Sequence, residues 1–298
     1  MNISRVESLV FGVEDVAAGI RYFDDWGLSC VERGARGAEF RTPAGQSILV
    51  RPATDAALPS APEDGSTLRE AIWGVDDDAS LAKIGAELSR DRDVGMDAQG
   101  TLHARDAAGF AFGFRRAAPV KTPPAAAADR MNRPFDPERR ARPSRIGHIV
   151  FNIPRQDIDT ALAFYLERLQ FRLTDRALDT GAFMRCPGSN DHHNLFFALR
   201  ANRASFNHAA FEVRDIDEIV LGGKYMKSRG WRPNTPLGRH ILGSNVFWYF
   251  DNPCGGRTEY FADMDQMDDN WQPRVWEKNP GFAMWMIDPD EVPALSRI

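Results

Sequence analysis

The chain of 298 residues has few cysteines and no long apolar run, and both shortages narrow the classes of protein that it fits. Cys30, Cys186 and Cys254 are odd in number and widely spaced, which argues against a disulfide framework and against a cysteine metal site. No apolar stretch approaches the roughly 20 residues of a membrane span, and the first residues lack a secretory charge and cleavage pattern. We therefore expect a cytoplasmic protein in a reducing compartment, without a membrane partner.

Basic residues are also too few for a nucleic-acid binder. The 37 Lys and Arg residues are outnumbered by 42 Asp and Glu residues, which gives a net charge of -5, and only the short stretch ERRARPSR is basic. The electrostatic footprint of nucleic-acid binding is missing. The length fits about two domains with a sizeable core. A small organic molecule is the expected partner.

One pattern occurs four times along the chain: a short apolar strand ending in Val or Ile, followed by an acidic helix start. The four copies read LVFGVEDVAAGI, AIWGVDDDASLAKI, IVFNIPRQDIDTALAFY and AAFEVRDIDEIV. Apolar residues at helical spacing follow each strand, and shorter β-rich runs follow each helix. The repeating unit is therefore β-α-β-β-β, and we predict an α+β fold of four such modules.

A proline-rich segment divides the four units into two pairs. Six prolines between residues 119 and 143 exclude long regular structure, so residues 119–142 are the predicted linker. It separates an N-terminal domain, 1–118, from a C-terminal domain, 143–265. A tail rich in Trp and Met follows at 266–298, and three roles stay open for it: covering a pocket mouth, binding a neighbouring subunit, or packing over the sheet.

Two histidines and a glutamate form the candidate metal site. His148 and His208 lie in the strand-like runs IGHIVFNI and FNHAAFEV, and Glu259 lies in a hairpin-like segment further on. Alone, each is more often a core histidine or a solvated carboxylate. Together they leave about three of six octahedral positions open, which is how non-haem Fe(II) binds substrate and O2. We predict an Fe(II) site, with Mn(II) as the alternative because the same donors accept either ion.

The two halves can be compared because they align with each other. RVESLVF matches RIGHIVF, and LREAIWGV matches FNHAAFEV. The first half carries other residues at the three ligand positions, namely Ser8 for His148, Glu70 for His208 and Gly113 for Glu259. The first half is therefore predicted to be a metal-free structural copy.

A hairpin is predicted between the runs NVFWYF and RTEYF, because the residues between them favour a turn. A register symmetric about Cys254 places Tyr249 opposite Glu259, with Cβ atoms roughly 5 Å apart on one face. Tyr249 would then lie over the metal. An ordinary aromatic strand residue is an equally good interpretation of the pattern.

The segment from Gly238 to Glu259 resembles the signature of type I extradiol ring-cleavage dioxygenases, within the vicinal oxygen chelate superfamily. The matching residues are Gly238, His240, Tyr249, Asn252, Pro253, Gly255 and Glu259. Trp248 departs from the pattern, which has an aliphatic residue or Phe there, and this affects pocket shape. The resemblance implies two domains, each an open, curved, mixed β-barrel with outer helices. It also implies an inactive first half and the ligands His148, His208 and Glu259.

The resemblance further implies a histidine for acid-base catalysis about fifteen residues before the second ligand, where His193 lies. Alternating strand geometry lets only one of His192 and His193 face the metal, and we assign His193. His240 and Tyr249 match positions that hydrogen-bond to the substrate in that family. Weaker candidates for substrate contact are His192, Asn245 and Trp248.

The implied activity is cleavage of a catechol-type aromatic diol with O2 to a muconic semialdehyde-type product, by a homo-oligomer. His193 would take up and return a proton. Three alternatives remain. The spacing of His240 and Tyr249 disfavours an Fe(II) oxygenase like 4-hydroxyphenylpyruvate dioxygenase. A glyoxalase-type isomerase would use four ligands from two modules, and the complete triad disfavours a ligand-binding protein of the bleomycin-resistance kind.

Overall fold

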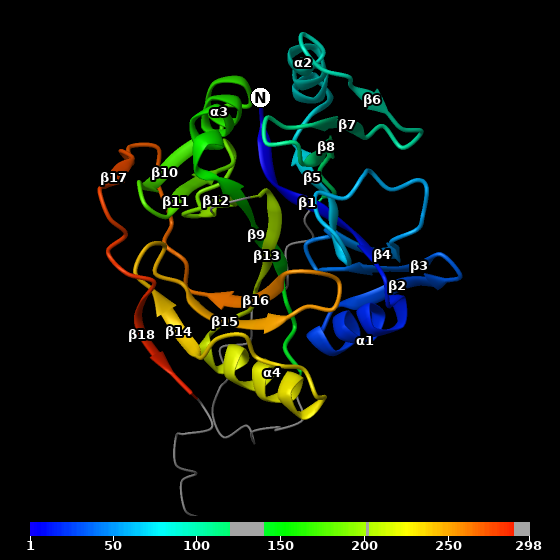
Figure 1. Cartoon of the computed structure of the whole chain (residues 1–298), viewed down its shortest axis with the longest axis vertical. Helices are drawn as coiled ribbons and strands as arrows, with labels where there is room; N and C mark the ends of the chain where they lie inside the picture. The colour runs from blue at the N-terminus through cyan, green and yellow to red at the C-terminus, as the bar shows by residue number, and fades with distance from the viewer. Residues whose placement is uncertain (120–139, 201–202, 289–298) are drawn as a thin grey trace, which may run out of the picture.

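The computed structural model describes residues 1–119, 140–200 and 203–288, and it contains four β-α-β-β-β units (Figure 1). The first unit comprises β1 (Ile3–Val13), α1 (Val16–Trp26), β2 (Ser29–Gly34), β3 (Gly37–Arg41) and β4 (Ser47–Pro52). The second comprises β5 (Thr67–Val75), α2 (Asp78–Leu88), β6 (Gly95–Met96), β7 (Leu102–Arg105) and β8 (Ala111–Arg116). Most of the predicted linker falls outside the described residues. None of the helices in the described part of the chain has the length and apolar character that a membrane crossing requires.

The second half repeats this order and then adds two strands. The third unit comprises β9 (Arg145–Pro154), a 3-10 turn (Arg155–Asp157), α3 (Ile158–Ala163), a π-helical turn (Phe164–Arg168), β10 (Arg172–Ala177), β11 (Gly181–Arg185) and β12 (Leu195–Arg200). The fourth comprises β13 (Ser205–Glu212), α4 (Ile216–Ser228), β14 (Leu237–His240), β15 (Val246–Asp251) and β16 (Arg257–Ala262). The tail contributes β17 (Arg274–Trp276) and β18 (Ala283–Ile287).

Each half forms one mixed sheet, so the predicted α+β fold of four modules is confirmed. The first sheet has eight strands in the order β2-β3-β4-β1-β5-β8-β7-β6. The second has ten, in the order β17-β10-β11-β12-β9-β13-β16-β15-β14-β18. The central strands of the two sheets correspond one to one, and in the second sheet the tail strands extend both edges. The described part of the tail therefore contributes strands to the second sheet.

Aspartates begin three of the four helices, as the acidic helix starts predict. The side chains of Asp15, Asp77 and Asp215 each accept a hydrogen bond from a first-turn backbone N–H. The third unit differs, because Asp157 makes no capping bond and the helix is broken into 3-10, α and π turns. The apolar positions predicted to face the core there, such as Tyr165, are nonetheless buried. This helix is therefore stabilised by burial of its apolar face and not by a capping hydrogen bond.

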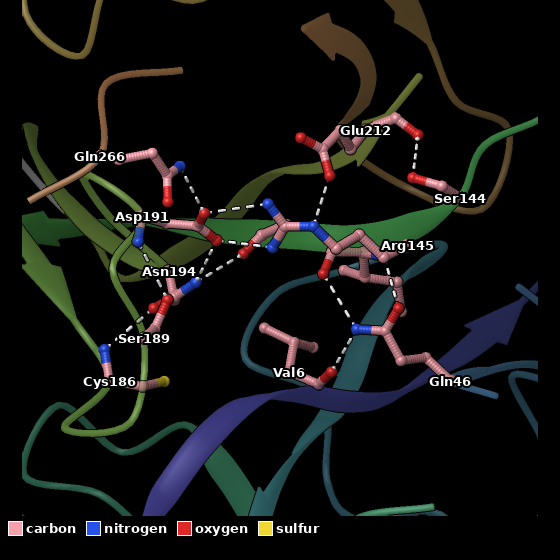
Figure 2. Close-up of polar contacts among 12 residues, drawn as sticks. Val6, Gln46, Ser144, Arg145, Cys186, Ser189, Asp191, Asn194, Glu212 and Gln266 are labelled. Atoms are coloured by element: carbon pink, nitrogen blue, oxygen red, sulfur yellow. Dashed lines mark hydrogen bonds and ion pairs between the residues drawn. The ribbon is translucent and has the colours of Figure 1, made fainter. Parts of the chain in front are cut away.

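The two halves meet along their first strands and along α1. Gln46 bridges β1 and β9, because its Nε2 donates to the carbonyls of Val6 and Ile146 while its Oε1 accepts from Ile146 N (Figure 2). At the end of α1, the ring of Trp26 stacks on Tyr260 of β16 with ring centroids 3.5 Å apart. These contacts tie the first half to the strands of the second half.

Two glycines allow this close approach. Gly27 ends α1 with φ of 100°, and a Cβ there would lie 1.9 Å from the carbonyl oxygen of Ala141. Gly255, in the hairpin turn before β16, has φ of 110°, and its Cβ would lie 2.3 Å from the carbonyl oxygen of Ser66. Both positions combine a left-handed backbone with backbone contact across the two halves, which only glycine tolerates.

The strand pairing places the first-half residues where the alignment of the halves predicts them. Ile72 of β5 pairs with both Ser8 and Gly113, just as Ala210 of β13 pairs with both His148 and Glu259. Glu70 holds the place of the second histidine. Its carboxylate lies 2.7 Å from Nδ1 of His103, whose Nε2 lies 3.2 Å from Asp97. An ion pair therefore stands in the first half where the second half places its candidate ligands.

This ion pair predicts how stability depends on pH. The hydrogen bond to Glu70, opposed by partial burial, raises the pKa of His103 from 6.5 to about 9. A raised pKa stabilises the folded state fully below the unfolded value of 6.5, and this contribution disappears as the pH rises through 9. His103→Gln should therefore cost about 1–2 kcal/mol at pH 6, after allowance for solvent screening, and close to nothing at pH 10. Urea denaturation of both proteins across this range measures it, and a difference that does not change with pH would contradict it.

Candidate metal centre

Three neighbouring strands carry the predicted ligands. His148 lies on β9, His208 on β13 and Glu259 on β16, and these strands are adjacent in the sheet. Ala210 of β13 is the pairing partner of both His148 and Glu259, and His208 lies two residues before Ala210. Because side chains two residues apart share a face, all three side chains project from the same face of the sheet.

Their donor atoms converge. Oε2 of Glu259 lies 3.1 Å from Nε2 of His148 and 3.2 Å from Nε2 of His208. One ligand atom from each residue lies within 4.8 Å of the others, and all three side chains are buried. Buried carboxylates are costly unless a partner or a metal ion compensates their charge. Two imidazoles and a carboxylate with this spacing are a donor set for a divalent cation.

The hydrogen bonds around His208 fix which of its ring nitrogens can bind a metal. Nδ1 lies 2.8 Å from Oδ1 of Asn207, an acceptor that also receives a hydrogen bond from Arg257. Nδ1 must therefore carry the proton, and Nε2 keeps a lone pair directed at Glu259. Among the described residues, this Nε2 has no hydrogen-bond partner. A lone pair facing a carboxylate oxygen at 3.2 Å fits a shared cation, and a hydrogen bond from the other ring nitrogen, as from Nδ1 to Asn207, orients a metal-binding histidine.

The electrostatics of the three groups agree with metal binding at neutral pH. Burial lowers the pKa of His208 to about 3, so that its imidazole is neutral. Burial alone would raise the pKa of Glu259, but its close contacts with His148 and His208 outweigh the burial and lower that pKa. A neutral imidazole at His208 and an ionised carboxylate at Glu259 are the protonation states that a metal requires of these ligands.

A cavity of about 180 Å³ opens beside these ligands, and aromatic side chains form much of its wall. The aromatic residues that line it include Phe183, Phe196, Tyr249 and Phe282. Phe282 comes from the tail, just before β18, so the tail contributes to the wall of the cavity. The cavity volume is smaller than the roughly 300–1,000 Å³ of typical ligand pockets, and it suits a compact planar molecule.

His193, His240 and Tyr249 also line this cavity. The ring of His193 lies against that of His148, with centroids 4.1 Å apart, and burial lowers the pKa of His193 well below its usual value. Tyr249 pairs with Glu259 across the β15–β16 hairpin, so the register predicted from the turn is confirmed. Its hydroxyl lies 3.0 Å from Nε2 of His240. Burial raises the pKa of Tyr249 and keeps this hydroxyl protonated.

Two residues predicted to contact the substrate, Trp248 and His192, do not line the cavity. Trp248 is buried on the opposite face of β15, against Gly223 of α4, because neighbours along a strand alternate sides and Tyr249 faces inward. His192 does not line the cavity either, and its Nε2 contacts Asp175. The two adjacent histidines lie in the loop before β12 and not in a strand, so loop conformation rather than strand alternation separates their rings.

Asn245 also differs from its predicted role. It does not line the cavity, and its Nδ2 donates to Oε1 of Glu259 at 3.0 Å, which fixes the orientation of that carboxylate. We expect Asn245→Ala to weaken metal binding about 10- to 100-fold, the usual effect of removing such a partner. Equilibrium dialysis with Mn(II) measures this. Asn270→Ala, at an exposed site in the tail, is the control, and unchanged affinity in Asn245→Ala would contradict the role.

A network of polar side chains holds the loop that carries His193 (Figure 2). Arg145 binds Asp191 through two hydrogen bonds of 2.5 and 2.9 Å and also contacts Glu212. Asn194, on the other side of the histidine pair, donates to the carbonyl of Gly147 and to Asp191. The two residues that flank the histidine pair are therefore fixed to β9, the strand of His148. Paired guanidinium–carboxylate contacts of this kind are among the stronger hydrogen bonds in proteins.

Several residues at the site had no role in the sequence analysis. Arg257 and Asn207 line the cavity, and alternation along β16 could have found Arg257, which lies two residues before Glu259. Asp175 contacts His192, which lies 17 residues further along the chain. The carbonyl of Phe282 accepts a hydrogen bond from Nδ1 of His240, which lies 42 residues before it. No local pattern in the sequence signals these last two contacts.

Comparison with known proteins agrees with this geometry. Residues 145–260 match the family described as the Glyoxalase/Bleomycin resistance protein/Dioxygenase superfamily. Over 127 residues, 43% of this chain, the sequence is 37% identical to metapyrocatechase 2 of Cupriavidus necator. That match covers 39% of the length of the relative, so the chain aligns with well under half of it.

Solved structures resemble nearly the whole chain in fold. The Mn(II)-bound glyoxalase of Novosphingobium aromaticivorans has a TM-score of 0.76 at 22% identity, with coverage of 98% of this chain and 95% of its own. A halotolerant catechol dioxygenase has the same TM-score at 18% identity, with coverage of 97% and 96%. Since two kinds of activity share the fold equally, only the side chains of the site can discriminate between them.

Proposed function

We propose that this chain, whose second half is a domain of the Glyoxalase/Bleomycin resistance protein/Dioxygenase superfamily, is a metal-dependent extradiol dioxygenase of catechol-type diols. The observation that carries the proposal is the convergence of three buried donors, two of which, His148 and His208, line an aromatic cavity. Three protein ligands leave room for a diol and for O2 at the same ion. The metal proposed is Fe(II), with Mn(II) as the alternative.

His148, His208 and Glu259 would hold the Fe(II), which would supply Lewis-acid and redox chemistry for the reaction of the diol with O2. The other tasks fall to the residues of the chain. His193 faces the cavity as a neutral imidazole and is placed to accept the proton of a diol hydroxyl. The hydroxyl of Tyr249, which lies 3.0 Å from Nε2 of His240, can donate to an oxygen atom on which negative charge develops, and His240 would hold that hydroxyl at the cavity. The aromatic walls hold the substrate ring and exclude water.

The ligand count favours ring cleavage over isomerisation. Within the described residues, only His148, His208 and Glu259 group as ligands of one ion, and the corresponding positions of the first half are Ser8, Glu70 and Gly113. A fourth ligand from the first module, as expected of a glyoxalase-type isomerase, is therefore missing from this part of the chain.

The size and lining of the cavity favour a substrate class. A compact aromatic cavity suits a single-ring catechol.

Oxygen consumption tests the proposal. The protein is loaded with Fe(II) or Mn(II) without air and then given catechols with one or two rings. We expect one O2 consumed per catechol and a yellow ring-opened product with one of the two metals. Stoichiometric metal binding with no O2 uptake on any catechol would reject the dioxygenase. Isomerisation of a glutathione hemithioacetal by the same sample would then favour the isomerase.

A further inference from the structure

His192 lies directly behind His193, between that residue and a buried carboxylate. Nδ1 of His192 is 3.0 Å from Nδ1 of His193, and Nε2 of His192 is 2.8 Å from Oδ2 of Asp175. All three side chains are buried, with 5% or less of their surface exposed. Only His193 of the three lines the cavity. A buried row of ionisable groups therefore connects Asp175 to the cavity side of His193.

When both rings are in their neutral form, the contacts allow only one arrangement of their protons. A carboxylate only accepts hydrogen bonds, so Nε2 of His192 must carry the proton that it donates to Asp175. Nδ1 of a neutral His192 is then an acceptor, and the Nδ1 of His193 must be the donor between them. This leaves Nε2 of His193 without a proton. Among the described residues no hydrogen-bond partner is found for this Nε2, and its ring lines the cavity.

Other contacts hold this row in place. Oδ1 of Asp175 accepts from the indole N–H of Trp276 at 2.7 Å and lies 3.6 Å from Arg274. Both residues belong to β17, which pairs with β10 at Asp175. On the other side, Asp191 and Asn194 flank the histidine pair and are fixed by the network around Arg145 (Figure 2). The carboxylate can therefore not turn its two oxygens without losing these partners.

We propose that Asp175 and His192 are positioning residues that hold His193 in the one neutral tautomer whose Nε2 can accept a proton in the cavity. This deepens the proposed function and rests on it for its effect on catalysis. His192 is thus assigned a role that does not require contact with the substrate. In the opposite tautomer, Nε2 of His193 would carry a proton and present a donor where the proposed reaction needs an acceptor.

Asp175→Asn tests this directly, because it is isosteric and should invert the tautomer. The amide oxygen should face Trp276 and Arg274, which both donate, so the amide NH2 faces His192. His192 must then accept at Nε2 and donate from Nδ1, which forces the proton of His193 to Nε2. We expect kcat to fall about 10- to 100-fold with little change in KM and unchanged metal content, as for other residues that orient a catalytic group.

A second variant distinguishes this role from a structural one. His192→Gln changes the shape of the side chain, but its amide can donate to Asp175 and accept from His193, so we expect kcat within about threefold of wild type. Asp159→Asn, at an exposed ion pair with Arg176, is the control. A purely structural role predicts the opposite order, with the isosteric Asp175→Asn the milder change. That order, or loss of metal in Asp175→Asn, would overturn the proposal.

The tautomer of His193 can also be determined by NMR, without measuring catalysis. The chain has six histidines, so ¹⁵N labelling of histidine in the Zn(II)-loaded protein gives few ring signals to assign. We expect an unprotonated Nε2 on His193 in the wild type and in His192→Gln, and a protonated one in Asp175→Asn. A protonated Nε2 in the wild type would overturn the proposal. If wild-type protein cleaved no catechol, the proposed function would fail while this measurement still decided the tautomer.

Discussion

Glu259→Gln is expected to abolish ring cleavage and most of the metal binding. The carboxylate is the only anionic ligand of the proposed site, and its Oε2 lies between the ring nitrogens of His148 and His208. An amide of the same shape removes the negative charge that attracts a divalent cation. The metal stabilises the transition state of the proposed reaction by several kcal/mol, so losing it should reduce the rate of ring cleavage about 10³-fold or more.

Metal content after anaerobic loading with Fe(II), followed by O2 uptake on a catechol, measures this effect. The matched control is Glu70→Gln, the same chemical change at the first-half position that corresponds to His208. Glu70 pairs with His103 and lies in the other sheet, so its loss should leave metal content and kcat unchanged. If Glu259→Gln still bound one Fe(II) per chain and consumed O2 at the wild-type rate, the centre would not lie at this glutamate.

The parts of the site that follow local rules could be predicted from the sequence. Strand alternation and the repeat placed His148 and His208 on corresponding strands, and the turn around Cys254 set the pairing of Tyr249 with Glu259. These relations involve residues close in sequence or related by the duplication. The same alternation argues against Trp248 as a cavity residue, since it must face away when its neighbour faces inward.

Contacts made by the tail could not be predicted. Two roles were open for it beyond packing over the sheet, and the structure shows β17 and β18 paired to opposite edges of the second sheet. This pairing brings Trp276 to Asp175 and the carbonyl of Phe282 to His240. The tail strands are short and have no regular alternation, because they lie at sheet edges with partly exposed side chains. Their positions depend on the completed sheet, which no local pattern encodes.

The second large effect is expected for Trp26→Ala, in the first half. The ring of Trp26 is fully buried at the end of α1, stacks on Tyr260 at 3.5 Å and makes edge contacts with Phe211 and Phe250. Tyr260 follows Glu259 on β16, and its hydroxyl donates to the carbonyl of Trp26. Truncation of a buried tryptophan leaves a cavity and costs about 3–5 kcal/mol. Urea denaturation of the metal-free protein should show this loss in the free energy of unfolding.

Trp26→Phe is the matched variant, because it keeps an aromatic ring on Tyr260. The indole Nε1 of Trp26 has no hydrogen-bond partner within the described residues, so phenylalanine loses only volume and should cost about 1–2 kcal/mol. If the first half supports the ligand strand through this ring, Mn(II) affinity should also fall in Trp26→Ala and be retained in Trp26→Phe. Since the ring lies on the face of β16 opposite to Glu259, a loss of affinity can only be transmitted through the backbone of that strand. A Trp26→Ala protein within 1 kcal/mol of wild type, with unchanged Mn(II) affinity, would show that the two halves fold and bind metal independently of this contact.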